Sequence, residues 1–123
     1  MNLSPFFKGI IDADEKAIVI CDTSNTIIYM NPAAVRQYAK RGGASLVGQS
    51  IFDCHNERSR EIIKANVAKM KADKTVNKIF EFHKSRDGCN DDVYCAAIRD
   101  ENGEFIGYYE KFEDKNLYRN GEI

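Results

Sequence analysis

The chain has 123 residues, of which 43% are hydrophobic and 30% charged, and this length and composition fit one folded domain and exclude a disordered chain. Its 18 Lys and Arg against 19 Asp and Glu give a net charge of −1, so we expect neither nucleic acid nor an acidic membrane as a partner. No unbroken apolar run approaches the roughly 20 residues that span a bilayer, so we expect no transmembrane helix.

The N-terminal segment predicts a cytoplasmic protein, and the cysteines fit that location as free thiols. The segment lacks the basic start and the long apolar stretch of a secretory signal peptide. Disulfides are disfavoured in the cytoplasm, and the cysteines do not occur at the Cys-x-x-Cys spacing of structural zinc sites. We therefore expect free thiols and no metal at Cys21, Cys54, Cys89 and Cys95.

The first predicted element is a short helix within residues 1–16. Ser4 suits the N-cap, and Pro5 suits the first helical position. The apolar residues that follow recur at helical spacing and form one stripe: Phe6, Phe7, Ile10 and Ile11. This stripe has to be covered by another surface.

A β-hairpin is predicted next. Residues 17–21 and 26–30 are apolar and β-branched, and the turn-forming residues at 22–25 separate them. Asn31 and Pro32 then end the second run, because proline disfavours a continuing strand.

Short helical pieces follow the hairpin. Pro32 suits the start of a helix that includes residues 33–39 and ends at the glycine pair 42–43. Residues 45–52 are interrupted by Gly48, so we expect only one or two helical turns there.

A longer helix is predicted from Asn56, which suits its N-cap. Ile63, Val67 and Met70 are spaced by four and three residues and form one apolar side. Lysines occupy the opposite face or the last turn, where they favour the negative end of the helix dipole. The helix should therefore pack on one side only.

The last third of the chain predicts three strands, at residues 75–83, 93–98 and 105–112. Turn-forming residues at 85–88 separate the first two, and an Asn-Gly pair within 100–103 separates the last two. The order of elements predicts an α+β fold, with a five-stranded antiparallel sheet and helices on one face.

In order and spacing, these segments resemble a PAS sensory domain from about Phe7 to Asn116. The segments that carry the resemblance are residues 17–22, 26–34, 46–53 with its Leu-x-Gly, 54–58, 86–88, 96–107 and 113–116. In residues 54–58, Asn56 stands where the family often has a proline after the histidine. The resemblance implies an N-terminal flanking helix at 1–16, the PAS domain at 17–116 and a C-terminal tail at 117–123.

The PAS fold implies a pocket between the inner face of the sheet and the helices. Aromatic residues at strand spacing most often only pack in the core, but a buried tyrosine hydroxyl needs a partner that a polar ligand could supply. The candidates for ligand contact are Tyr29, Asn31, Tyr38, His55, Ile63, Phe80, Phe82, Tyr94 and Tyr109.

The resemblance leaves the cofactor open. Light-sensing flavin members need a reactive cysteine in a Gly-x-Asn-Cys segment, and Ile51 stands in its place, so we expect no photochemical adduct, although flavin binding without one stays open. Haem-binding members generally carry their axial histidine within the long helix, and residues 58–70 contain none. His55 is expected instead to cap or hydrogen-bond the start of that helix.

Two function classes rank above an enzyme that uses the pocket for catalysis, because no nucleophile–base arrangement or phosphate-binding loop is evident. The first is a cytoplasmic sensor that binds a small molecule and signals through a partner protein or through dimerisation. The second is an interaction module whose core is filled by its own side chains. The exposed stripe at residues 6–11 predicts a homodimer through the first helix and the outer sheet face, and a monomer with this helix folded back is the alternative.

Overall fold

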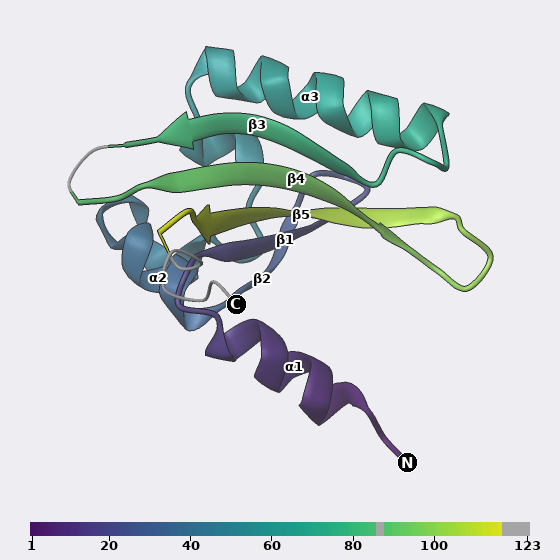
Figure 1. Ribbon diagram of the computed structural model, residues 1–123, viewed down its shortest axis with the longest axis horizontal. Helices are drawn as coiled ribbons and strands as arrows, with labels where there is room; N and C mark the ends of the chain where they lie inside the picture. Colours follow the sequence, from purple (N-terminus) through teal and green to yellow (C-terminus); the bar gives the residue numbers. More distant parts are fainter. Residues whose placement is uncertain (86–87, 117–123) are drawn as a thin grey trace.

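The computed structural model describes residues 1–85 and 88–116 and has the predicted five-stranded antiparallel sheet (Figure 1). The strand order is β2-β1-β5-β4-β3, so the N-terminal hairpin and the three C-terminal strands join in one sheet. The strands are β1 Ile18–Asp22, β2 Ile27–Met30, β3 Lys78–Lys84, β4 Asp91–Arg99 and β5 Phe105–Asp114. The predicted tail at 117–123 and part of the turn at 85–88 lie outside the described residues.

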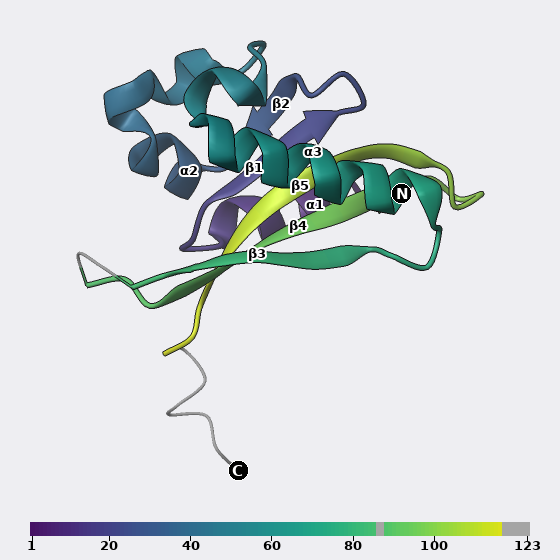
Figure 2. The same cartoon turned by 90° about the horizontal axis from the view of Figure 1, so that it is seen from above.

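The helices divide between the two sides of the sheet. They are α1 Ser4–Ala13, α2 Pro32–Gln37 and α3 Glu57–Ala72, with the 3-10 turns η1 Ala39–Arg41, η2 Gly43–Leu46 and η3 Ile51–Cys54. Figures 1 and 2 together show α3 on one face of the sheet and α1 on the other side. Among the described helices, none has the length and apolar character needed to cross a bilayer.

Some element boundaries differ from the sequence prediction. The third strand begins at Lys78 rather than Thr75, because the Asp73 carboxylate accepts hydrogen bonds from the amide and hydroxyl of Thr75 and holds a turn there. β4 and β5 are both longer than predicted, since their ladder extends to the pair of Asp91 and Asp114. Ser4 is the first residue of α1 rather than its N-cap, and Leu3 takes the cap position.

The hydrophobic core lies between α3 and the face of the sheet that α3 covers. Alternate residues of β1, β4 and β5 point inward, as the period of a strand requires. Cys21 and Cys95 are completely buried in these strands and are free thiols, which confirms that they serve as small hydrophobic residues. Ile63, Val67 and Met70 of α3 cover them, as predicted.

Asn31 joins three elements through hydrogen bonds of its buried side chain. Its Oδ1 accepts from the amide of Ile18 on β1 at 2.9 Å and from the amide of Ala34 on α2 at 2.9 Å. Its Nδ2 donates to the carbonyls of Ile11 and Lys16, at 3.0 Å each. The side chain therefore caps α2 and fixes the chain between α1 and β1.

Helix α1 makes polar contacts at its C-terminal end. The Tyr29 hydroxyl donates to the Asp12 carboxylate, and Lys111 forms an ion pair with Asp14 at 2.6 Å. None of its residues is buried, and Phe6, Phe7 and Ile10 are 60%, 57% and 72% exposed. The apolar stripe is therefore present but is not covered by the sheet of the same chain.

Replacing Asn56 by Ala tests the predicted start of α3. The Asn56 side chain accepts a hydrogen bond from the Ser59 amide at 2.9 Å, which confirms the N-cap. We expect Asn56→Ala to lower the free energy of unfolding by about 1 kcal/mol, the usual cost of losing such a cap. Urea unfolding followed by circular dichroism measures it, with the exposed Asn102→Ala as the control, and an unchanged midpoint would contradict the capping role.

Candidate ligand-binding cleft

Two adjoining spaces lie beside the start of α3 on the inner side of the sheet. The inner cavity has a volume of about 30 Å³ for the centre of a water molecule, and Ile63, Glu81, Val93 and Glu110 are among its walls. The outer cleft has a volume of about 390 Å³ on the same measure and opens to the surface. Five residues are common to the walls of both spaces, and the region that they share is called the passage below: Tyr38, His55, Ser59, Phe82 and Phe112.

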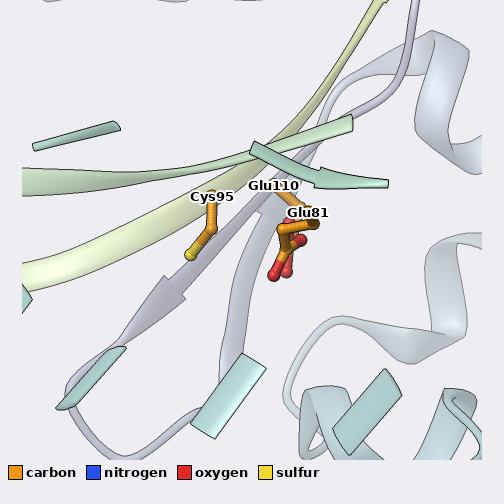
Figure 3. Close-up of side chains that lie close together, drawn as sticks. All are labelled: Glu81, Cys95 and Glu110. Carbon is orange, nitrogen blue, oxygen red and sulfur yellow. The ribbon is translucent and has the colours of Figure 1, made fainter. Parts of the chain in front are cut away.

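Two carboxyl groups meet at the inner cavity. Glu81 comes from β3 and Glu110 from β5, with Cys95 of β4 beside them (Figure 3). The carboxylate oxygens and the Cys95 sulfur lie within 4.8 Å of one another. Asn66 of α3 donates a hydrogen bond to Glu81 Oε2 at 2.8 Å. Strand pairing and α3 thus place two acidic groups where most neighbours are apolar.

Glu110 is the least satisfied polar side chain at this site. The residue is only 5% exposed, and within the described residues neither carboxyl oxygen has a hydrogen-bond partner. Burial, and then a side-chain hydrogen bond with the neighbouring Glu81 carboxyl, raise the pKa of Glu110 well above its usual range. A protonated Glu110 can donate this bond to Glu81, whereas an ionised Glu110 has no donor among the described residues and needs one from a ligand.

His55 and Tyr38 hold neutral polar groups in the passage. The His55 ring contacts the Ile51 carbonyl through Nδ1 at 2.8 Å, which assigns the proton to Nδ1 because a carbonyl only accepts. Burial lowers the pKa of His55, and burial raises the pKa of the Tyr38 hydroxyl. At neutral pH the passage is therefore lined by an uncharged imidazole and an uncharged phenol.

The structure places four of the nine candidate residues around these spaces. Tyr38, His55, Ile63 and Phe82 line the inner cavity. His55 also precedes α3, and its carbonyl accepts from Arg60 Nε at 2.9 Å, so it contributes to the start of that helix.

The prediction that the other strand aromatics line the inner pocket is wrong. Tyr29 and Tyr109 both pair with Ile20 on the outer face of the sheet, and Tyr29 contacts α1. Phe80 and Tyr94 pack edge to face against each other, with centroids 5.8 Å apart, on the same outer face. The residues directly before or after these aromatics in the sequence point towards the inner face instead.

Asn31, which was predicted to contact a ligand, does not line the cleft. All of its side-chain polar atoms already bond to backbone groups of the same chain, as described above. The residue is completely buried and serves the fold.

Glu81 and Glu110 are absent from the sequence-based candidates. A signal for Glu110 does exist, because Tyr108 and Phe112 stand two residues before and after it, and all three share one face of a strand. A carboxylate in such a row is exceptional and marks a site.

The inner cavity is smaller than a large planar cofactor. An inner space of about 30 Å³ holds one or two water-sized groups, far less than an isoalloxazine or porphyrin ring occupies. Helix α3 carries no histidine that could bind a haem iron from the wall.

Comparison with known proteins agrees with the fold. The C-terminal domain of a protein from Streptococcus mutans is 20% identical, with a TM-score of 0.76 over 94% of this chain and 87% of that one. A PAS domain from Colwellia psychrerythraea is 20% identical, with a TM-score of 0.68 over 92% and 97%. Histidine kinase ThkA in complex with the response regulator TrrA is 15% identical, with a TM-score of 0.63 over 93% of this chain and 33% of that one.

No curated protein matches the chain. A family model described as the PAS fold matches residues 11–115, which covers the whole sheet and every helix except the first turns of α1. Together with the strand order and the helices described above, this match shows that the chain belongs to the PAS fold family.

Proposed function

We propose that this chain is a signal-sensing PAS module that binds a small molecule in the cleft between α3 and the sheet and relays the event to a partner protein. The observation that carries the proposal is Glu110, a buried carboxyl group without a hydrogen-bond partner in the described residues, at the inner end of an open cleft. Such a group costs free energy in the free protein, and a ligand that donates to it recovers that cost.

The comparisons support a signalling role in general terms. The similar histidine kinase ThkA was solved with a response regulator, so a domain of this fold serves in a signalling protein there. For the present chain, the signalling partner, the absence of catalysis and the cytoplasmic location are parts of the proposal. In this proposal, the cleft binds a ligand and does not catalyse a reaction.

Native mass spectrometry and an absorbance scan of freshly purified protein test ligand binding. A bound small molecule, or a rise in melting temperature with members of a metabolite library, is the expected result. Ser59→Phe would fill the passage and abolish the rise, whereas Ala65→Phe, at an exposed position of the same helix, would retain it. A clean unliganded mass with no thermal shift across the library would instead support the pure interaction module.

A second part of the proposal is a homodimer through α1 and the outer face of the sheet. The exposed stripe of Phe6, Phe7 and Ile10 supports it, because burying two or three such side chains contributes several kcal/mol at about 25 cal/mol per Å². Ile28 of β2 and Ile106 of β5 are further apolar side chains of the sheet that are about half exposed. A second copy would cover both surfaces.

Sedimentation of the double variant Phe6→Glu, Ile10→Glu tests this interface. We expect a dimer for the wild type at tens of micromolar and a monomer for the variant, because two buried charges oppose association. Ala65→Glu, Ala68→Glu on the exposed side of α3 is the matched control and stays dimeric. A monomeric wild type, or a double variant that remains dimeric, would contradict the interface.

A further inference from the structure

We propose that the ligand is a small zwitterion whose primary ammonium group enters the inner cavity and binds the Glu81–Glu110 carboxyl pair, while its acidic end lies in the outer cleft. This inference rests on the proposed function and names the chemical class of the ligand. Four observations support it: the unpartnered carboxyl group, the size of the cavity, the aromatic wall and the charge of the outer cleft.

The carboxyl pair favours a ligand group that donates hydrogen bonds. Glu110 offers two oxygens without partners among the described residues, and Glu81 has one oxygen bonded to Asn66. A primary ammonium group carries three donors and a positive charge, so it can bond to both carboxyl groups at once. A carboxylate or phosphate at this position would be repelled, and a purely apolar group would leave Glu110 unpaired.

The size of the cavity limits the group that enters it. A volume of about 30 Å³ for water centres admits a group of one or two water molecules, which is the size of a primary ammonium with its adjacent methylene. A quaternary ammonium or a guanidinium is larger than this space. Tyr38, Phe82 and Phe112 contribute aromatic rings to the wall, and aromatic surfaces attract cations.

The outer cleft has the opposite charge. Lys40, Arg41 and Lys84 line it, and its described lining includes no carboxylate. The space between α3 and the sheet thus runs from two acidic groups inside to three basic groups outside. A ligand with an amine at one end and a carboxylate or phosphate at the other matches this gradient, and its chain would lie along His55 and Phe82.

A metal ion is the competing occupant, because Glu81, Cys95 and Glu110 could each supply one ligand atom. Zinc sites of this kind require a thiolate and usually a fourth ligand. Burial raises the pKa of the Cys95 thiol, which opposes the thiolate, and Cys95 is not part of the cavity wall. The geometry therefore favours the ammonium group.

Calorimetric titration with unbranched ω-amino acids of three to six carbons tests the inference. At least one member is expected to bind at least ten times more tightly than the deaminated acid and the decarboxylated amine of the same length. The proposal would be overturned if no member exceeds its two analogues, or if zinc binds to the wild type and loses affinity in Cys95→Ala.

Variants assign the two ends of the ligand. Glu110→Gln should weaken the best amino acid at least tenfold, whereas Glu113→Gln, on the outer face of the same strand, should leave it unchanged. Lys40→Gln with Lys84→Gln should weaken the amino acid but not the decarboxylated amine. Equal affinities in wild type and Glu110→Gln would overturn the proposal, with circular dichroism confirming that the variant is folded.

The result also separates this inference from the proposed function. A library compound without an amine that binds in the cleft, and is blocked by Ser59→Phe, would overturn the zwitterion while the sensor function stands. If no compound of any class binds, both fail.

Discussion

Asn31→Ala is expected to lower the free energy of unfolding by about 3–5 kcal/mol, because it removes hydrogen bonds from buried backbone groups that have few other partners. The amides of Ile18 and Ala34 and the carbonyls of Ile11 and Lys16 all lose the bond to this side chain. Each buried group left unsatisfied costs about 1–3 kcal/mol, and water can reach only those near the end of α1. Urea unfolding followed by circular dichroism measures the loss.

The matched control for this change is Asn102→Ala, at an exposed position of the β4–β5 turn. Its cost should stay within about 0.5 kcal/mol, as for most surface substitutions. Asn31→Asp distinguishes the contribution of the Oδ1 acceptor from that of the Nδ2 donor. It keeps an oxygen that accepts from the amides of Ile18 and Ala34, but it loses the group that donates to the backbone carbonyls. A loss below about 1 kcal/mol for Asn31→Ala would contradict the role assigned to this residue.

Glu110→Gln is expected to stabilise the free protein by about 1–3 kcal/mol near pH 7.5, although it should weaken ligand binding at least tenfold. The wild-type carboxyl group loses hydration on burial and faces the Glu81 carboxyl, whereas a neutral amide can donate to Glu81. For a domain of this size, each kcal/mol corresponds to about 4 °C in melting temperature. Thermal unfolding of the two proteins without added ligand measures the difference.

The stability gained by Glu110→Gln should increase as the pH rises. The pKa of Glu110 is raised in the folded protein, so the folded state holds a proton that the unfolded state loses above about pH 4.5. Wild-type stability from this group is therefore complete below that pH and falls as the pH rises towards the folded pKa. Glu81, Cys95, His55 and Tyr38 surround the same space, and Glu81 is the group whose charge most affects it.

Melting curves of the wild type and Glu110→Gln, recorded between about pH 4 and pH 8, test this prediction. The advantage of Glu110→Gln should be near zero at the acidic end and largest at the alkaline end. Glu113→Gln, which loses only the exposed ion pair with Lys78, should differ from the wild type by less than about 1 kcal/mol at every pH. A Glu110→Gln variant that is less stable than the wild type at pH 8 would show that the carboxylate is satisfied in the free protein.

Local sequence signals predicted most of the fold. The apolar, β-branched runs at residues 17–21 and 26–30, the turn formers between them and the Asn-Gly pair at 102–103 each predict a strand or a turn from neighbouring residues alone. Gly103 indeed has φ +79°, and Asn56 caps α3. The boundaries that differ depend on tertiary pairing, such as the extension of the β4–β5 ladder to Asp114.

The candidate site could be predicted only in part, because it depends on which face of each strand points inward. Tyr108 and Tyr109 are adjacent, and a one-residue difference decides that Tyr108 is in the core while Tyr109 is outside. Phe80 and Phe82 are two residues apart in β3, and a regular strand would turn both to the same face. The register with β4 shifts between them, so Phe80 lies on the outer face and Phe82 lines the cleft. On the helical side, the structure places three of the predicted residues in the wall of the inner cavity: Tyr38, His55 and Ile63.

The central claim is that a small molecule binds between α3 and the inner face of the sheet. Proton–nitrogen NMR spectra of the labelled protein, recorded with and without pooled metabolites, test it most directly. The account predicts that at least one pool shifts amide signals concentrated at Tyr38, His55, Ser59 and Glu110, and that Ser59→Phe removes these shifts. Spectra unchanged by every pool, or shifts confined to α1 and the outer face of the sheet, would contradict it.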